Sequence, residues 1–366
     1  MTLIAIISNP TSAPFIVSDV LISGQQQPAG RMLGPSGPIV SYDKKSGYYP
    51  ENLEQKMIII GSHLCMAYAG ASIIGKSISK KFMETFCNTT PKKDLLSNIL
   101  SEYDSELEQF DTSIIVAFID ENNEFDYITY GDGFVSKEFS DGTKIKSVGT
   151  GSELLIEHFD VVCNSPVGGC PPVAGTLHRV LSILSEFVAW DCYSGEYRLH
   201  TGGLIEIASL SDNRLEKLPS ALLGTILYKF NNGTAHAIGE AYLDFCYYDD
   251  ILVFRRFGDI RLNEAKEIAG SDYLIGTIRG VRTSDYHERT DAAVRKIVAK
   301  LHQTSAIQIF SLIDVENPAS RKILFEREDW NNFRIWRSES SFKVWKSKKL
   351  QNKFSNLLGV TKLYNL

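Results

Sequence analysis

Apolar runs of strand length, separated by short polar turns, dominate the first seventy residues. Residues 2–8 and 15–23 are two such runs, and a turn rich in asparagine, proline and serine lies between them. Residues 56–60 and 64–70 form a second pair around a turn that begins with glycine. Apolar runs on either side of a short polar turn are typical of β-hairpins, so the pattern predicts two hairpins.

Helical periodicity begins directly after the second hairpin. Residues 71–88 carry apolar side chains at helical spacing, and residues 92–110 repeat the pattern after a Thr-Thr-Pro break. Strand-like runs then return at 112–120, 124–131 and 134–148. A short helix from Ser152, a longer amphipathic helix at 173–191 and a further strand at 202–210 follow them. This order predicts an α+β chain in which helices cover the outside of packed sheets.

Two parts of the chain depart from this regular alternation. Residues 24–55 are rich in glycine and proline and show little periodicity, so we expect a long loop, which in a compact domain is either functional or mobile. Beyond residue 220 the pattern is looser, and the expected elements are a strand or helix at 221–230, a strand pair at 241–257, a helix at 287–303 and a strand at 307–313.

The C-terminal tail has a distinct composition. From residue 320 onward it holds eleven Lys and Arg against four Asp and Glu, together with three of the four tryptophans. A basic aromatic segment of this kind can contact phosphates or acidic partners. We favour an amphipathic segment whose tryptophans bury against the core.

Composition narrows the class of protein. A chain of 366 residues suggests one large domain or two ordinary ones, and a formal charge of -6 gives no reason to expect nucleic acid as a partner. No apolar run approaches the length of a membrane span, and the N-terminus lacks the positive region of a secretory signal. The six cysteines include no C-x-x-C pair, so we expect reduced thiols, no metal site and a cytoplasmic protein.

Four residues at the ends of the predicted strands suggest hydrolytic chemistry. Thr2 follows Met1, and Asp19 lies in the second apolar run. Lys56 opens the third run, and Gly70 ends the fourth. A threonine hydroxyl needs an adjacent base, and the α-amine of an N-terminal threonine has a pKa of about 7.7–8.0. A nearby ammonium lowers that pKa and a carboxylate holds the ammonium in place. A glycine N–H can then donate to an oxyanion.

These features resemble the proteasome β subunits, the bacterial HslV protease and related bacterial proteasome homologues. The closest local match is KMIIIGSHLCMAYAG at 56–70, which follows the family's order of lysine, strand, turn and strand ending in Ala-Gly. Ser18-Asp19 stands where the family has Ala-Asp, and Gly149-Thr150-Gly151 stands at its Gly-Ser-Gly turn. Each motif is weak by itself, but their order makes the resemblance specific over residues 2–210.

The resemblance implies a set of catalytic residues. Carried over by position, Thr2 is the nucleophile, Asp19 and Lys56 tune it, Gly70 supplies the oxyanion donor and Thr150 is an accessory hydroxyl. The family's late Asp-x-x-Ser-Gly-Gly block is less well matched here. Its best counterparts are Asp191 and Ser194, with Thr201 as a rival for the serine.

A specificity pocket follows from the same comparison. Its lining would be Ile22, Ile58, Tyr68, Ser72 and Lys76. Because Tyr68 would make the pocket shallow, we expect cleavage after small or medium apolar residues.

The chain also departs from the family's pattern. The segment 24–55 is longer than its equivalent, and if it displaces the third strand, Lys44, Lys45 or Arg31 would replace Lys56. Residues 211–366 have no counterpart in a β subunit. We therefore expect a proteasome-like domain at 1–210 and a C-terminal α+β extension at 211–366.

Taken together, the resemblance implies a four-layer αββα sandwich and a threonine-type endopeptidase that forms an acyl-enzyme without metal or organic cofactor. It also implies peptide or unfolded-protein substrates, self-assembly into a ring or stacked homo-oligomer, and a separate ATP-dependent unfoldase as partner. Two alternatives stay open. One is a non-catalytic scaffold or binding subunit, and the other is an N-terminal nucleophile amidase that acts on a small molecule.

Overall fold

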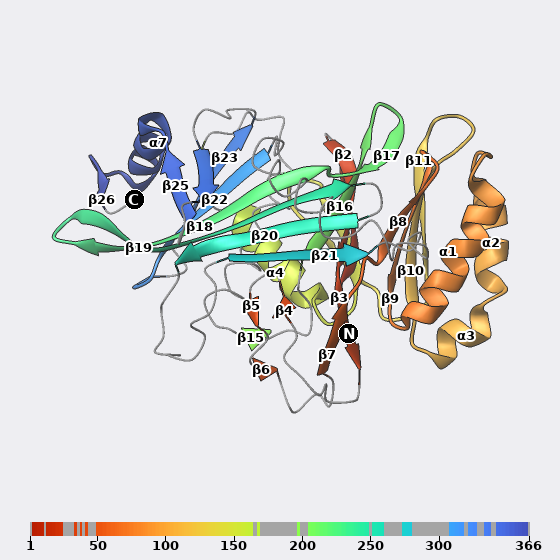
Figure 1. Ribbon diagram of the computed structural model, residues 1–366. Helices are drawn as coiled ribbons and strands as arrows, with labels where there is room; N and C mark the ends of the chain where they lie inside the picture. The colour runs from red at the N-terminus through yellow and green to blue at the C-terminus, as the bar shows by residue number, and fades with distance from the viewer. Residues whose placement is uncertain are drawn as a thin grey trace.

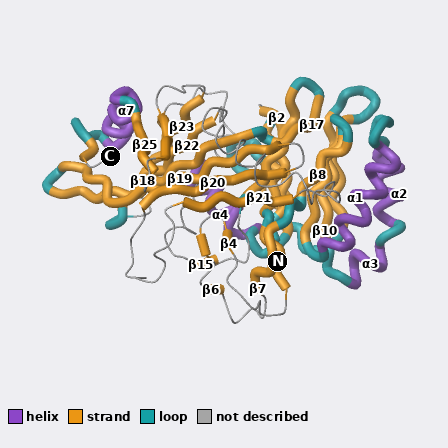
Figure 2. The backbone as a smooth tube through the Cα atoms, viewed as in Figure 1, coloured by secondary structure: helices purple, strands orange, loops and turns teal. Residues whose placement is uncertain are grey.

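The computed structural model has mixed α and β structure in which strands predominate (Figure 1). It describes residues 2–10, 12–24, 33–34, 37–38, 41–42, 49–163, 167–168, 196–197, 204–248, 251–259, 273–279, 307–317, 321–327, 333–337 and 342–364. Among these residues, no helix has the length and apolar character needed to cross a membrane. The helices α1 to α3 lie at one end of the molecule and α7 at the other, with the sheets between them (Figure 2).

The N-terminal sheet contains both strands of the first expected hairpin. Its strands in spatial order are β12 (Val135–Glu138), β13 (Lys144–Val148), β1 (Ile4–Asn9), β2 (Ser12–Asp19), β16 (Ile205–Ser211) and β17 (Arg214–Lys217). Neighbours are antiparallel, and the register places Ile4 opposite Val148 on one side and Ser18 on the other. The start of β1, the end of β2 and the end of β13 therefore lie at the same end of this sheet, measured along the strands.

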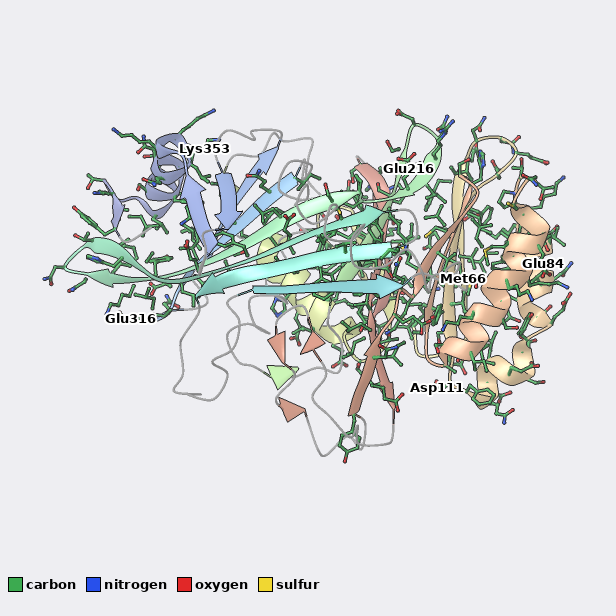
Figure 3. The ribbon with its side chains drawn as sticks, viewed as in Figure 1. Met66, Glu84, Asp111, Glu216, Glu316 and Lys353 are labelled. Carbon is green, nitrogen blue, oxygen red and sulfur yellow. The ribbon has the colours of Figure 1, made fainter. Side chains whose placement is uncertain are left out.

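A helix-covered sheet contains the second hairpin. Its order is β11 (Phe125–Tyr130), β10 (Ser113–Ile119), β9 (Leu64–Ala69) and β8 (Met57–Ile60). The helices on its outer face are α1 (Ser72–Phe86), α2 (Lys93–Ser101) and α3 (Asp104–Gln109). Figure 3 shows Glu84 on the outer side of this helical layer, whereas Met66 lies between the layers. The expected helix at 92–110 is interrupted, because the chain turns at Glu102 and Tyr103.

Burial on both faces explains the nearly continuous apolar runs of these strands. In β10, Ile114, Val116 and Phe118 pack against the helices, and the alternate residues face the N-terminal sheet. The two sheets thus share an apolar layer that includes Ile6 and Ile115. A strand that is covered on both faces has no reason to alternate between apolar and polar residues.

The C-terminal sheet is longer and mixed. Its order is β14 (Val167–Gly168), β23 (Arg321–Arg327), β22 (Ile307–Asp314), β18 (Ser220–Asn231), β19 (Thr234–Tyr248), β20 (Ile251–Asp259) and β21 (Tyr273–Arg279), and β26 (Leu363–Tyr364) pairs with β19. The central pair β18 and β22 is parallel, and its neighbours are antiparallel. Helix α7 (Lys348–Leu358) covers one face through Leu350 and Phe354. Residues 221–230 are therefore a strand.

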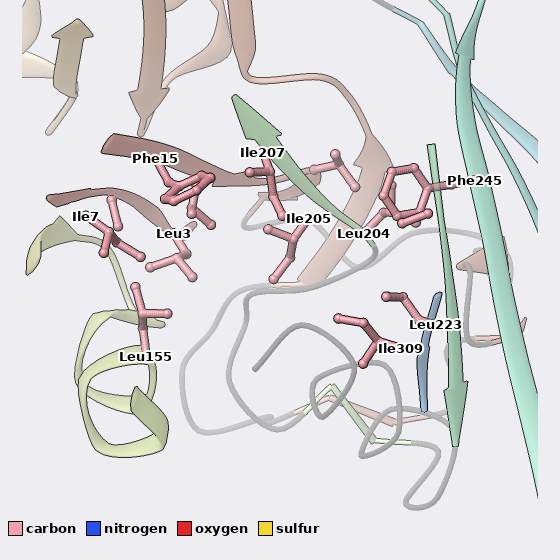
Figure 4. Close-up of a cluster of buried hydrophobic side chains, with 14 of the residues drawn as sticks. Leu3, Ile7, Phe15, Leu155, Leu204, Ile205, Ile207, Leu223, Phe245 and Ile309 are labelled. Atoms are coloured by element: carbon pink, nitrogen blue, oxygen red, sulfur yellow. The ribbon is translucent and has the colours of Figure 1, made fainter. Parts of the chain in front are cut away.

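One apolar core joins the C-terminal sheet to the N-terminal sheet. Figure 4 shows Leu155 of α4 (Ser152–Cys163) beside Leu3 and Ile7, while Phe245 and Leu223 reach the same cluster from the C-terminal sheet. The N-terminal sheet also continues through β17 to Lys217, past the expected domain boundary at residue 210. The residues after 210 are thus continuous with the packing of the first part of the chain.

Several short ladders complete the described structure. Within the segment 24–55 that was expected to be a loop, β7 (Tyr49–Leu53) pairs with β3 (Leu21–Gly24), which lies just before that segment. The prediction of a loop was therefore incomplete. The other ladders are β4 (Leu33–Gly34) with β5 (Gly37–Pro38), β6 (Ser41–Tyr42) with β15 (Glu196–Tyr197), and β24 (Phe333–Arg337) with β25 (Phe342–Lys346). The helices expected at 173–191 and 287–303 and the three tail tryptophans lie outside the residues or side chains that the structure describes.

Candidate active site

Thr2, Asp19 and Lys56 meet at the end of the N-terminal sheet where β1 begins and β2 ends. The Thr2 hydroxyl donates to Asp19 Oδ1 at 2.5 Å and accepts a hydrogen bond from Lys56 Nζ. Lys56 Nζ lies 2.7 Å from the same carboxylate oxygen, so each of the three side chains contacts the other two. The lysine is 1% exposed and the aspartate 0% exposed.

Strand pairing fixes the position of this group. The backbone N–H of Asp19 donates to Leu3 O at 2.9 Å, and the Leu3 N–H donates to Asp19 Oδ1 at 3.0 Å. The aspartate therefore holds both the hydroxyl of Thr2 and the backbone of the next residue. Since only Leu3 separates Thr2 from β1, this pairing determines where the Thr2 hydroxyl lies.

Lys56 is a buried ammonium whose pKa depends on the carboxylates around it. Burial lowers its pKa from the ordinary value of 10.5, and the charges of Asp19, Glu206 and Glu54 oppose that shift. The ammonium also donates to the carbonyl oxygen of Leu21, which satisfies a further proton. A buried ammonium with this many acceptors is held in one position.

The turn at Gly149 closes over the N-terminus. Gly149 has φ +103°, and a Cβ placed there would lie 1.9 Å from the carbonyl oxygen of Thr2. Only glycine permits so close an approach of two backbones. Thr150, the expected accessory hydroxyl, is exposed, whereas Ser152 is buried and its hydroxyl has no hydrogen-bond partner among the described residues.

Gly70 lies at the junction between β9 and α1 and is exposed. The Tyr68 N–H donates to Lys56 O at 3.2 Å, so the end of β9 lies beside the beginning of β8. Gly70 therefore lies at the same end of the sheet as Lys56. Its φ of +105° and the carbonyl oxygen of Asp111, which would be 2.4 Å from an added Cβ, both require glycine.

The expected pocket residues fall into two groups. Ile22 and Ser72 are partly buried and Lys76 is exposed, whereas Ile58 and Tyr68 contribute almost no surface. The ring of Tyr68 lies against α1, where an added Cβ at Gly75 would be 2.4 Å from it.

Glu54 links Tyr68 to Lys76. It accepts from the Tyr68 hydroxyl at 3.0 Å and pairs with Lys76 Nζ at 2.7 Å. Burial, and then the charge of Glu54, raise the pKa of Tyr68 well above 10.0, so its phenol stays protonated.

Glu206 is the residue that sequence reasoning missed. It is fully buried on β16, and its Oε2 accepts the backbone N–H groups of Lys56 at 2.9 Å and Met57 at 3.1 Å. Its Oε1 accepts from Lys217 Nζ at 2.6 Å and from the Tyr247 hydroxyl at 3.1 Å. The available signal was a single charged residue within the apolar run 204–208.

Some expected residues lie outside the described part of the chain. These are Asp191, Ser194 and Thr201 of the late block, and Lys44, Lys45 and Arg31, the rivals of Lys56. No protein-family model matches the chain, and no curated protein matches it. The geometry of Thr2, Asp19 and Lys56 is therefore the main guide to chemistry. It offers a hydroxyl beside an ion pair from which water is excluded, a setting suited to nucleophilic attack.

Proposed function

We propose that this chain is a threonine-type N-terminal nucleophile hydrolase that cleaves peptides after removal of Met1. The contact of the Thr2 hydroxyl with both members of the buried Lys56–Asp19 pair carries the proposal. The stacking of a helical layer, two sheets and α4 supports the αββα sandwich that accompanies this chemistry. Initiator methionine is commonly removed when a small residue such as threonine follows it.

The proposed reaction uses both groups of an N-terminal Thr2. Its α-amine takes the proton of Oγ1 while the oxygen attacks the scissile carbonyl carbon. The Gly70 N–H donates to the oxyanion, and the Lys56 ammonium keeps the amine neutral by lowering its pKa. The C–N bond of the substrate then breaks, and the leaving amine takes the proton from the Thr2 amine. Water hydrolyses the resulting ester and regenerates the hydroxyl.

Access to the hydroxyl depends on processing. In the chain that begins with Met1, Thr2 is 3% exposed. Loss of Met1 removes the residue attached to the Thr2 nitrogen, so we expect the hydroxyl and amine to become reachable together. This requirement links activity to a measurable change in mass.

Intact mass and N-terminal sequencing with a peptide epoxyketone test the proposal. The reagent bonds to a hydroxyl and an amine on the same residue, so only a free N-terminal threonine or serine forms the adduct. We expect a chain that begins at Thr2 and gains one reagent mass. Thr2→Ser keeps the reaction, Thr2→Ala abolishes it, and Thr89→Ala, which changes an exposed threonine, leaves it unchanged.

Other outcomes of this experiment would identify other functions. A chain that retains Met1 and does not react would indicate a scaffold or binding subunit. A processed chain that reacts but hydrolyses only small amides would indicate an amidase. Both results would contradict the proposed peptidase.

We also propose that copies of the chain assemble, because an unconfined peptidase would damage its own cell. The helical layer offers exposed apolar side chains for this purpose, including Ile73 at 71% exposure, Leu95 and Phe110. Light scattering should give a mass several times that of one chain. Ile73→Glu should lower that mass, and a folded substrate should be degraded only when an ATP-dependent unfoldase is supplied.

A further inference from the structure

A buried polar network connects the candidate active site to the C-terminal sheet. At its centre is Glu206, which is fully buried and accepts hydrogen bonds at both carboxylate oxygens. Tyr247, one of its donors, belongs to β19 of the C-terminal sheet. The network therefore joins parts of the chain that lie on either side of residue 210.

The Glu206 carboxylate performs a specific task at the start of β8. This strand is at the edge of the helix-covered sheet, and Lys56 lies just before its first residue. Among the residues that the structure describes, no further strand of that sheet flanks β8, so the buried N–H groups of Lys56 and Met57 need another acceptor. Glu206 Oε2 is that acceptor, at 2.9 and 3.1 Å.

Gln55 provides a second connection to the C-terminal sheet. It is buried, and its Nε2 donates to the carbonyl oxygen of Ile278 in β21 at 2.9 Å. Its Oε1 accepts from Lys217 Nζ at 2.7 Å. The same ammonium pairs with Glu206 and lies 4.9 Å from the centre of the Tyr247 ring. This network thus holds Gln55 through its side chain and the next two residues, Lys56 and Met57, through their backbone N–H groups.

We propose that Glu206 is a positioning residue for Lys56, and that the C-terminal sheet acts on the reaction through Tyr247 and Ile278. This inference rests on the proposed function of Thr2, Asp19 and Lys56. Asp19 fixes the ammonium of Lys56, and Glu206 fixes its backbone. A displacement of about 1 Å in a catalytic group can lower a rate by about a hundredfold. Residues after 210 therefore contribute to the position of Lys56 through these two contacts.

Conservative variants separate positioning from general stability. Glu206→Gln keeps the shape but loses the charge, and Tyr247→Phe removes one hydroxyl. Tyr242→Phe is the matched control, because this buried tyrosine of the same strand donates to Glu240 at 2.6 Å, away from Lys56. We expect epoxyketone labelling to slow about 10- to 100-fold in Glu206→Gln and about 3- to 10-fold in Tyr247→Phe, without change in Tyr242→Phe.

The pH profile of labelling gives a readout that a loss of stability would not move. The groups whose charges act on Lys56 are Asp19, Glu54 and Glu206, and Glu206 is itself paired with Lys217. Removal of the Glu206 charge takes away one influence that raises the pKa of Lys56. The ammonium is then lost at a lower pH, so the alkaline decline in labelling should move to lower pH in Glu206→Gln. In Tyr247→Phe the decline should stay in place.

Hydrogen exchange of the peptide around residues 54–58 provides a test that does not require activity. We expect faster exchange in Glu206→Gln and Tyr247→Phe than in the parent and in Tyr242→Phe. If the parent is labelled and both variants match it in rate and exchange, the positioning role is overturned and the proposed function stands. If the parent is never labelled, the proposed function fails. Exchange alone then decides whether Glu206 holds the Lys56 segment.

Discussion

Two lysine–carboxylate pairs that differ in solvent exposure lie in different regions of the molecule. At the end of the N-terminal sheet where β2 ends, Lys56 and Asp19 are 2.7 Å apart, and both side chains are buried. Lys346 of β25 and Glu240 of β19, a strand of the C-terminal sheet, are 2.5 Å apart, and Glu240 is 30% exposed. Each pair also binds a hydroxyl, from Thr2 in the first case and from Tyr242 in the second.

The difference between the pairs lies in what encloses them. Water can reach Glu240, so its charge is screened and the pair resembles a partly exposed salt bridge. Lys56 has only protein groups around it, and burial lowers its pKa. An enclosed pair contributes less to stability than its geometry suggests, because desolvation offsets the attraction. Its presence beside a hydroxyl is better explained by chemistry than by stability.

Substitution of Lys56 should have the largest effect. Lys56→Met leaves Asp19 buried without its cation, which should cost about 3–5 kcal/mol in the free energy of unfolding. Labelling of Thr2 should fall by about a thousandfold or more, since the amine loses the charge that lowers its pKa. Urea unfolding and epoxyketone kinetics measure the two effects.

A double variant separates the contribution of this pair to stability from its contribution to the labelling of Thr2. Asp19→Leu with Lys56→Met removes both charges, so it should be more stable than Lys56→Met alone and remain inactive. If Lys56→Met kept more than a tenth of the parent labelling rate, the comparison between the two pairs would lose its basis.

Glycines in the two regions offer the next contrast. Gly149 and Gly233 both have positive φ, but an added Cβ meets Thr2 O at 1.9 Å in the first case and nothing within 4 Å in the second. Gly149→Ala should displace Thr2 and slow labelling about a hundredfold. Gly233→Ala should cost only the conformational strain, about 1–2 kcal/mol, with labelling unchanged. Equal effects of the two variants on labelling would show that Gly149 does not position Thr2.

Gly70 and Gly359 give a smaller contrast of the same kind. Gly359 ends α7 with φ +70° and open space around it, whereas an added Cβ at Gly70 would meet the Asp111 carbonyl. Gly70→Ala should shift the proposed oxyanion donor and lower the turnover number about tenfold or more, with little change in KM. Gly359→Ala should lower stability alone. A change confined to KM in Gly70→Ala would assign Gly70 to substrate binding instead.

The sequence was most informative where polar residues end apolar runs. Asp19 ends β2, and Thr2 and Lys56 lie within two residues before β1 and β8. Their order along the chain was therefore visible, and strand pairing brings them together. The hairpins and the helix α1 were predictable for the same reason, since each depends on residues close in sequence.

The remaining features depend on contacts between distant residues. Glu206 reads as an isolated charge in a strand, and only the packing of β16 beside β8 shows that it binds the Lys56 backbone. The parallel pairing of β18 with β22 joins segments some eighty residues apart in the sequence, which local periodicity does not encode. The break between α2 and α3 likewise has no glycine or proline to indicate it.

Substitution of Lys346 should have the smallest effect and completes the comparison. Lys346→Met leaves Glu240 with the Tyr242 hydroxyl and with solvent, so the free energy of unfolding should fall by about 1–2 kcal/mol. The ring of Tyr242, which lies 5.9 Å from Lys346 Nζ, keeps an apolar neighbour in methionine. Epoxyketone labelling should stay within about twofold of the parent, because this pair contacts no reacting group. A loss as large as that of Lys56→Met would mean that enclosure does not distinguish the two pairs. The assignment of Lys56 to catalysis would then need support other than burial.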